Sequence, residues 1–365
     1  MANTLHLHLV AGFLGSGKTT AIVNACKALV RQGKRVGVIT NDQGKYLVDT
    51  AFVQLENFPA VEVGGGCFCC NYVDLEKQLE GLVETVKPDV VFAESVGSCA
   101  DLVATVVKPM LQLQQSAYRP TSFSTFVDVR LLRMRLDDIP LPFSDGIVYI
   151  FDKQIEETHL LVVNKMDLLA EEQRAEVLGQ ICSAYPDKVI LFQASLTEEG
   201  VQNWLQRIEE GSIPLPDASL DIDYQRYGEG EARLGWLDEE LEFEIPGGDG
   251  RTVVVAIMQA ILVSLQGADA GIGHVKFIVR GSTAGEAKVS FTTYMHPGWE
   301  EEIPPIIGEK ISLLVNARVE MPVEHLSELI DRAVMGIVEK MGLRWARRGR
   351  ESFHPSFPKP TYRLG

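Results

Sequence analysis

The sequence predicts an α/β domain with a mostly parallel sheet, followed by a smaller α+β domain. Short apolar runs alternate with helical stretches in the first part of the chain, which is typical of parallel strands covered on both faces. A proline-marked segment, Ser212–Pro216, interrupts this alternation. The 365 residues also exceed what one hydrophobic core usually serves. We therefore expect a first domain over 1–211, a linker over 212–240 and an α+β domain over 241–365.

The first domain contains several short runs rich in Val, Ile and Leu that read as buried strands. They are Leu5–Val10, Arg35–Thr40, Val61–Val63, Val90–Ala93, Thr125–Val127, Leu160–Val163 and Val189–Phe192. Helices are expected between them, at Lys18–Arg31, Leu75–Val86 and Glu171–Tyr185. The polar stretch 41–57 reads as a long loop.

The second domain has a different pattern, because its runs alternate in polarity or are β-branched. Four strands are expected, at Leu241–Ile245, Val275–Arg280, Lys288–Thr293 and Ile311–Ala317. Two helices are expected, at Val253–Gln266 and Glu324–Met341. This combination indicates an open antiparallel sheet with helices.

The charge of the chain narrows the classes of partner. A formal net charge of -16 repels a phosphate backbone, so we expect no nucleic-acid partner and no anionic membrane partner. The basic cluster Arg344, Arg347, Arg348 and Arg350 reads as a solvated helix end. No uninterrupted apolar run is long enough to span a bilayer, and the first ten residues lack the pattern of a secretory signal. The oligomeric state stays open, with a homodimer as one possible state.

The phosphate site is the strongest motif. Residues 12–19 read Gly-Phe-Leu-Gly-Ser-Gly-Lys-Thr and fit G-x-x-x-x-G-K-[ST] between a predicted strand and a predicted helix. Lys18 is expected to neutralise the β- and γ-phosphates, and the Thr19 hydroxyl to bind Mg²⁺. This makes the first domain a P-loop NTPase domain. Its expected nucleotide contacts are Gly12, Gly15, Ser16, Gly17, Lys18, Thr19 and Thr20.

A second motif selects the base. Asn164, Lys165 and Asp167 follow a buried strand, at the end where open α/β sheets bind ligands. The Asp167 carboxylate can accept hydrogen bonds from guanine N1–H and the N2 amino group, whereas adenine presents an acceptor at N1. We therefore expect GTP and GDP as ligands. Ser195 is expected in the loop that closes over guanine, although an N-cap at Ser195 or Thr197 explains that segment equally well.

Two segments are expected to respond to the γ-phosphate. Glu94, at the tip of a predicted strand, can hold Mg²⁺ through water or orient the attacking water. Gly97 supplies an amide that can sense the γ-phosphate. Asp42 begins the long loop and is assigned to the catalytic and Mg²⁺ set, with an ordinary turn aspartate as the alternative.

Cys67, Cys69 and Cys70 crowd into four positions of the six-cysteine sequence. Such spacing is poor for disulfides and good for a thiolate-bound metal, which indicates a reducing compartment, the cytoplasm. Three thiolates suit Zn²⁺, Co²⁺ or Cu⁺, and leave one coordination position open for a switch loop or a partner. The alternatives are buried small hydrophobes or a redox pair. Cys99 is expected to be a core residue rather than a fourth ligand.

Together these motifs resemble those of the CobW-type metallochaperone GTPases, relatives of the urease and hydrogenase nickel-insertion GTPases. The resemblance rests on residues 12–20, Gly66–Cys70, Glu94–Gly97, Gln154–Glu156 and Asn164–Asp167. It implies slow GTP hydrolysis coupled to delivery of a metal, often Zn²⁺ or Co²⁺, with Cys67, Cys69 and Cys70 as ligands. The family usually has Asn-Glu-Phe-Gly at 41–44, where this chain has Asn-Asp-Gln-Gly.

The function expected from the sequence is that of a GTP-hydrolysing metallochaperone. Its Cys-x-Cys-Cys cluster would bind a transition metal and deliver it to a metal-dependent client protein. One alternative is a GTP-dependent assembly or activation factor for a metalloenzyme or corrinoid enzyme. Another is a redox-regulated GTP switch.

Overall fold

The computed structural model describes residues 5–44, 48–113, 118–245, 247–293 and 298–365. Its contacts divide the chain into two compact units. Unit 1 takes in residues up to Gln43, Asp49–Gly230 and the tail Phe357–Gly365, and unit 2 contains Glu231–Ser356 and a short segment at Gly44. The unit boundary therefore follows residue 230, inside the stretch expected as a linker, and the tail groups with the first unit.

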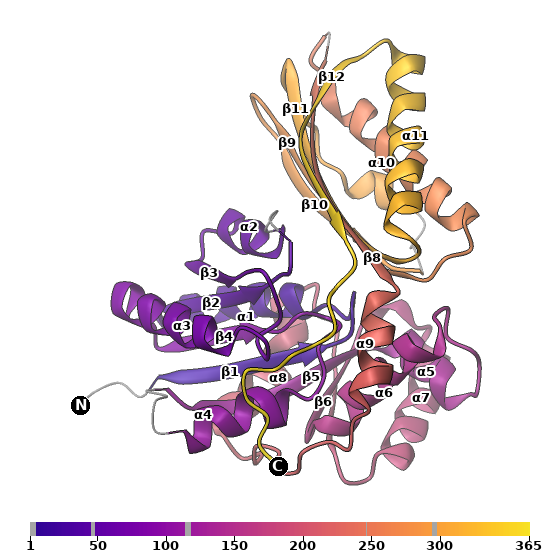
Figure 1. Cartoon of the computed structure of the whole chain (residues 1–365). Helices are drawn as coiled ribbons and strands as arrows, with labels where there is room; N and C mark the ends of the chain where they lie inside the picture. Colours follow the sequence, from indigo (N-terminus) through magenta and orange to yellow (C-terminus); the bar gives the residue numbers. More distant parts are fainter. Residues whose placement is uncertain (1–4, 45–47, 114–117, 246, 294–297) are drawn as a thin grey trace. The chain divides into compact units, whose positions relative to one another are not determined.

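Unit 1 is built on a seven-stranded sheet with the order β3-β2-β4-β1-β5-β6-β7, and its neighbouring strands are parallel (Figure 1). The α/β class predicted from the alternating pattern is therefore confirmed. The strands are β1 (His6–Gly12), β2 (Val36–Asn41), β3 (Ala60–Val63), β4 (Val90–Glu94), β5 (Pro120–Asp128), β6 (Leu160–Asn164) and β7 (Val189–Phe192).

Helices cover both faces of this sheet because its strands are apolar on both sides. The helices α1 (Lys18–Arg31) and α8 (Glu198–Glu210) pack with Phe92 and Phe126 in one core, centred on the buried Trp204. On the other face, α3 (Tyr72–Val86) places Leu82 against Gly37, where an added Cβ would lie 2.8 Å from the leucine side chain.

The remaining helices of unit 1 connect these strands, except the last helix, which follows β7. They are α2 (Val48–Leu55), the π-helical turn η1 (Val103–Val107), α4 (Lys108–Gln112), α5 (Val129–Leu136), α6 (Asp145–Glu157), the 3-10 turn η2 (Met166–Leu168), α7 (Glu171–Ala184) and α9 (Tyr224–Ala232), whose last residues lie beyond the unit boundary.

The prediction of one long loop over 41–57 is wrong, because α2 occupies Val48–Leu55. The reason is the apolar pair Phe52 and Val53, which is surrounded by polar residues and so gives no helical pattern in the sequence. Val53 is fully buried in the core of α1 and α8, and Phe52 packs against the same core. Burial of this pair fixes the segment as a helix despite its irregular pattern.

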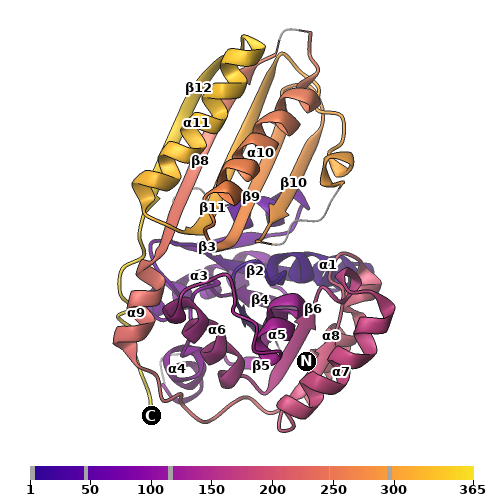
Figure 2. The ribbon, with the colours of Figure 1, turned by 90° about the vertical axis from the view of Figure 1, so that its right-hand side faces the viewer.

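Unit 2 is an antiparallel sheet with the order β10-β9-β11-β8-β12. Figure 2 shows α10 and α11 lying along one face of it, where they enclose the second hydrophobic core. The α+β prediction is confirmed. The elements are β8 (Leu234–Glu244), α10 (Gly250–Gly267), β9 (Ile272–Gly281), β10 (Glu286–Phe291), the 3-10 turn η3 (Trp299–Glu302), β11 (Lys310–Glu320), α11 (Val323–Met341) and β12 (Arg344–Phe353).

The basic cluster at 344–350 lies on the edge strand β12 and not on a helix end, so that interpretation is wrong. This strand was not predicted because charged residues stand where a strand usually has alternating apolar residues. Arg347 and Arg350 pair with the buried Glu239 and with Asp331. These basic side chains therefore neutralise acidic neighbours.

Among the described residues, α10 is the one helix long and apolar enough to cross a membrane by length and composition. Such a helix also arises in the core of a soluble domain. Here Val254, Ile257 and Ile261 are fully buried against the antiparallel sheet. The apolar character of α10 is accounted for by this packing.

The buried carboxyl group of Glu157 should make the stability of the chain depend on pH. Burial raises the pKa of Glu157 from 4.5 to about 8, and its Oε1 accepts a hydrogen bond from Val103 N. The folded chain therefore holds this proton at pH values where the unfolded chain releases it. The contribution to stability is complete below pH 4.5 and is lost as the pH rises towards about 8.

We expect Glu157→Gln to remove this dependence, because a neutral amide can still accept from Val103 N. Urea unfolding at several pH values between 5 and 8.5 measures the effect. The free energy of unfolding of the parent chain should fall across this range more steeply than that of the variant. Parallel curves for the two proteins would contradict the assignment.

Candidate functional site

The predicted site residues converge on one edge of the seven-stranded sheet. Gly12, Asn41, Glu94 and Asn164 are the last residues of β1, β2, β4 and β6. The carboxyl ends of parallel strands meet at a common edge, where open α/β sheets bind ligands. The sequence motifs that are far apart in the chain are therefore brought together.

The P-loop has the backbone that the motif requires. Gly12, Gly15 and Gly17 all have positive φ angles, of 131°, 70° and 93°. A Cβ on Gly12 would lie 2.1 Å from Phe126 O, and one on Gly17 would lie 2.3 Å from the Asn164 amide. These glycines thus allow both the left-handed turn and the close approach of neighbouring strands.

Polar groups inside the P-loop suit an anion. Lys18 Nζ donates to Gly12 O at 2.7 Å and to Phe13 O at 3.4 Å, so the ammonium group is curled back into the loop. The Ser16 hydroxyl is buried and has no hydrogen-bond partner among the described residues. The helix α1 begins directly after this loop, at Lys18. A phosphate group would satisfy these donors at the helix N-terminus.

The magnesium ligands predicted at Thr19 and Glu94 lie together, but Asp49 joins them. Thr19 Oγ1 lies 2.9 Å from Glu94 Oε1 and 3.2 Å from Asp49 Oδ1. Asp42 is buried just beyond the end of β2. Two carboxylates beside the P-loop threonine form an oxygen-rich donor set that fits Mg²⁺. Asp49 was missed because it lies in the first turn of a helix that was expected as loop.

We expect Asp49→Asn to weaken the binding of Mg²⁺, because the substitution removes one negative charge from this donor set. The Mg²⁺ concentration for half-maximal Mg²⁺-dependent nucleotide binding should rise by about tenfold, as is common when a residue that supports a metal site is removed. A magnesium titration measures it, with the exposed Asp217→Asn as control. An unchanged titration would exclude Asp49 from the metal site.

The base-site motif is held by a hydrogen-bond network. Asn164 Nδ2 donates to Ser16 O at 2.8 Å, which joins the motif to the P-loop. Asn164 Oδ1 accepts from Ser195 N at 3.1 Å and from Ser195 Oγ at 2.7 Å. Asn24 Nδ2 of α1 donates to Ser195 O at 2.7 Å. Asn164 therefore braces the loop at Ser195, while Thr197 is the residue that caps α8.

The two charged residues of the motif have different surroundings. Lys165 Nζ lies 3.0 Å from Asp128 Oδ2, which Arg130 also contacts. Burial raises the pKa of Asp128, but Lys165 and Arg130 outweigh it and lower this pKa to about 2. Asp167 lies in the exposed turn η2. A base at this position would meet an exposed carboxylate and the stem of Lys165.

The cysteine segment forms a compact group of sulfurs. Cys67 Sγ lies 2.7 Å from Cys69 Sγ and 3.3 Å from Cys70 Sγ, and the latter two are 3.7 Å apart. Cys69 Sγ lies a further 3.8 Å from Cys99 Sγ. The neighbouring thiols and burial raise the pKa of Cys69 well above its usual value. Because the thiols share one region, the group can offer several sulfurs to a single soft ion.

Both expected switch segments are tied to this group of sulfurs. Asn41 Nδ2 donates to Val63 O at 2.8 Å and to Gly66 O at 2.7 Å, while Asn41 Oδ1 accepts from Phe68 N at 2.8 Å. The end of β2 therefore fixes the backbone on both sides of Cys67.

On the other side, the buried Gln154 of α6 donates from Nε2 to Gly97 O and to Cys99 O, each at 2.9 Å. Gly97 also lies against the P-loop, because an added Cβ would approach Leu14 N to 2.9 Å. One side chain thus joins the segment beside the phosphate loop to the cysteine group. Gln154 carried no assigned role in the sequence analysis, since its partners are backbone carbonyls more than 50 positions away.

The tail of unit 1 lies over the half-buried Cys70. Lys359 N donates to Cys70 Sγ at 3.2 Å. Thr361 N donates to Cys69 O and Thr361 Oγ1 to Cys70 O, both at 2.8 Å. This segment was assigned to the second domain from sequence alone, so its contact with the cysteines was not foreseen.

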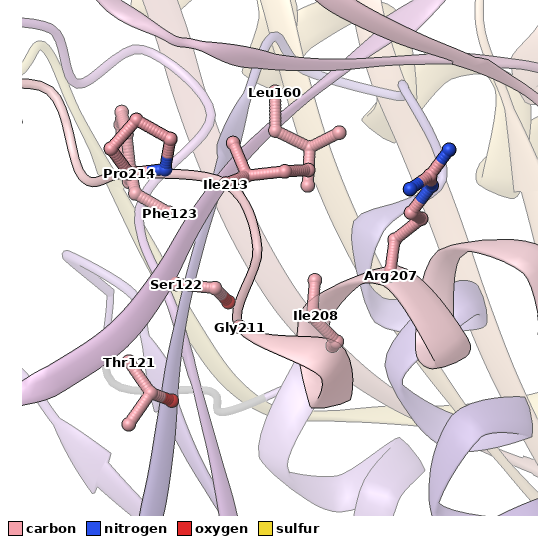
Figure 3. A pocket seen from close by; sticks show the side chains of 9 residues that line it. All are labelled: Thr121, Ser122, Phe123, Leu160, Arg207, Ile208, Gly211, Ile213 and Pro214. Carbon is pink, nitrogen blue, oxygen red and sulfur yellow. The ribbon is translucent and has the colours of Figure 1, made fainter.

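A small hollow elsewhere in unit 1 is distinct from this edge. Figure 3 shows it between Thr121 and Ser122 of β5, Leu160 of β6 and Ile208 near the end of α8. These strand residues lie at the amino ends of β5 and β6, whereas the motifs follow the carboxyl ends. The hollow therefore belongs to the opposite edge of the sheet.

Comparison with known protein families shows which family these motifs belong to. Residues 6–192 match the family described as CobW/HypB/UreG, nucleotide-binding domain. The chain belongs to the CobW/HypB/UreG family. The match covers half of the chain and contains every predicted motif of the site except the loop at Ser195. The resemblance inferred from the P-loop, the cysteine cluster and the base motif is thus confirmed.

Curated relatives of this CobW/HypB/UreG chain carry the names of zinc proteins. The zinc chaperone CobW of a Sinorhizobium species is 26% identical over 51% of this chain and 58% of its own length. The zinc chaperone YeiR of Escherichia coli is 29% identical over 45% of this chain and 48% of its own. The zinc-regulated GTPase metalloprotein activator 1 of Dictyostelium discoideum is 23% identical, over 66% and 53%. The chain therefore spans only about half of the length of these relatives.

Solved structures give weaker likenesses. The Zn(II)-bound YjiA GTPase of Escherichia coli has a TM-score of 0.38 and 14% identity, covering 92% of this chain and 99% of that one. HypB of Helicobacter pylori in complex with nickel has a TM-score of 0.41 and 13% identity, over 59% and 93%. The fold assignment therefore rests on the sheet order and on the family match.

Proposed function

We propose that this chain is a GTP-hydrolysing metallochaperone, which binds a transition metal at its cysteine cluster and delivers it to a client protein. One observation carries the proposal: the group of sulfurs is attached at two places to the edge of the sheet where the phosphate motif lies. Asn41 anchors it to the end of β2, and Gln154 anchors it to Gly97. A site built in this way can change when the nucleotide changes.

The nucleotide part of the proposal follows from the donors at the edge. Lys18 and the P-loop amides would hold the phosphates, and Asp167 would select guanine. Mg²⁺ at Thr19, Glu94 and Asp49 would neutralise charge that develops during phosphoryl transfer. Glu94 would orient the attacking water from the tip of β4. The Gly97 amide would respond to the γ-phosphate, with Asp42 at the start of the other switch.

The metal part rests on thiol chemistry and on the relatives. Cys67, Cys69 and Cys70 would bind the ion as thiolates, which suits Zn²⁺ or Co²⁺ in a reducing cytoplasm. Relatives that match about half of this chain are named zinc chaperones, which favours Zn²⁺. A metal-dependent protein would be the client, as the name of a metalloprotein activator among the relatives suggests. Neither nucleic acid nor a membrane is a proposed partner, and the homodimer remains a prediction.

Equilibrium dialysis of the purified chain against Zn²⁺ and Co²⁺ tests the function. The proposal predicts about one ion per chain at a site of Cys ligands. Transfer of that ion to a chelator should then proceed at different rates with GTP and with GDP. A chain that hydrolyses GTP but retains no ion in dialysis would instead fit an assembly factor, and would overturn the metallochaperone.

A further inference from the structure

The group of sulfurs contains one more member than the Cys-x-Cys-Cys motif supplies. Cys99 Sγ lies 3.8 Å from Cys69 Sγ, although 30 positions separate the two residues. The sulfurs of Cys67, Cys69 and Cys99 all lie within 4.8 Å of one another, and all three residues are buried. Cys70, the last residue of the motif, is only half-buried.

Two of the separations between these sulfurs suit a tetrahedral ion. Metal–sulfur bonds of about 2.3 Å in a tetrahedron place neighbouring sulfurs about 3.8 Å apart. The pairs Cys69–Cys70, at 3.7 Å, and Cys69–Cys99, at 3.8 Å, already have this separation. Both shorter separations, 2.7 and 3.3 Å, involve Cys67. Rotation of that one side chain away from its neighbours would relieve both.

A core role alone does not account for Cys99. The fully buried Cys26 shows what a core cysteine looks like here, because it lies in α1 among the apolar residues of the first core. Cys99 is equally buried, but its sulfur faces another sulfur. Its backbone is also fixed, since Gln154 Nε2 donates to Cys99 O. The side chain is therefore held in the position of a ligand.

We propose that Cys99 is a ligand of the transported metal. Cys67, Cys69 and Cys99 then hold the ion from the interior, and the half-buried Cys70 is the fourth sulfur, which exchanges during transfer. This inference rests on the proposed metallochaperone function and extends its ligand set. Each thiol that binds releases its proton to solvent, and no oxidation or reduction accompanies binding.

Such a site would link metal and nucleotide through one short segment. Gly97 lies against the P-loop, and Cys99 follows two positions later in the segment clamped by Gln154. A displacement of Gly97 would therefore move the ligand Cys99 directly. The Cys67–Cys70 turn would not be needed to transmit it. A three-cysteine site limited to the motif would lack this connection.

Cobalt spectroscopy of single variants tests the ligand set. Co²⁺ bound by thiolates absorbs through sulfur-to-metal charge transfer, whose intensity follows the number of sulfurs. We expect Cys99→Ala to lower this intensity by about a quarter, as when four thiolates become three, and to weaken Co²⁺ binding. The exposed Cys182→Ala should leave the spectrum unchanged. A Cys99→Ala spectrum equal to that of the parent chain would overturn the proposal.

X-ray absorption of the zinc-loaded chain provides a count that does not depend on folding of the Cys99 variant. We expect about four sulfurs in the parent chain and about three in Cys70→Ala. Three sulfurs in the parent chain and two in Cys70→Ala would exclude Cys99 as a ligand. The metallochaperone function would still stand. A parent chain that binds neither Co²⁺ nor Zn²⁺ would instead overturn that function, and the ligand assignment with it.

Discussion

Replacing Asp167 by Asn is expected to lower the affinity for GTP by a factor of about 10²–10⁴. The carboxylate would accept hydrogen bonds from guanine N1–H and from the N2 amino group. Each hydrogen bond to a charged group contributes about 1.5–3 kcal/mol, and about 1.4 kcal/mol corresponds to tenfold in affinity. Asp167 is exposed in η2, so the substitution should leave the fold intact and the loss should report on base binding.

The same variant permits a gain-of-binding control. Xanthine carries a carbonyl oxygen where guanine has its amino group, so the amide of Asn could donate to it while still accepting from N1–H. The Asp167→Asn chain should therefore bind xanthosine triphosphate better than GTP, and the parent chain should prefer GTP. Titration with fluorescent analogues of both nucleotides measures this change of preference. If the variant lost the same affinity for both nucleotides, Asp167 would not contact the base.

Replacing both Cys67 and Cys69 by Ala is expected to abolish stoichiometric metal binding. These two buried sulfurs belong both to the motif and to the compact trio with Cys99, so their loss leaves at most two neighbouring thiols. Two ligands cannot close a tetrahedral site, and the bound metal should fall below about a tenth of an ion per chain. Metal analysis after dialysis measures this loss.

Nucleotide binding is the internal control for the double variant. The P-loop and the base motif do not use either sulfur, so the GTP affinity of the variant should equal that of the parent chain when both are measured without metal. The exposed Cys182→Ala should keep both the metal and the nucleotide. Metal content equal to that of the parent chain would show that the ligands lie outside the cluster.

Much of this account could be read from the sequence because its signals are local. The P-loop spacing between a strand and a helix predicted both the fold of unit 1 and the position of Lys18 and Thr19. The apolar run before Asn164 placed the base motif at a strand end. The crowding of Cys67, Cys69 and Cys70 predicted a common group of sulfurs. Each of these features depends on neighbours within a few positions.

The remaining features depend on contacts between distant segments. Asp49 reaches Thr19 only because a buried Val53 turns an apparent loop into α2. Cys99 read as a core residue, since nothing in its own segment shows that Cys69 lies beside it. The tail at Lys359 contacts Cys70 from almost 300 positions away. Periodicity and spacing carry no information on such pairs.

In the proposed function, metal binding and nucleotide binding are reciprocally linked, and calorimetric titration of Zn²⁺ measures this linkage. The affinity for Zn²⁺ should differ between the chain with a non-hydrolysable GTP analogue and the chain with GDP by about 5–150-fold, the usual range for coupled sites. Gln154→Leu should bind both ligands but reduce this ratio towards one. Equal Zn²⁺ affinity in the two nucleotide states of the parent chain would show that the two sites are not linked.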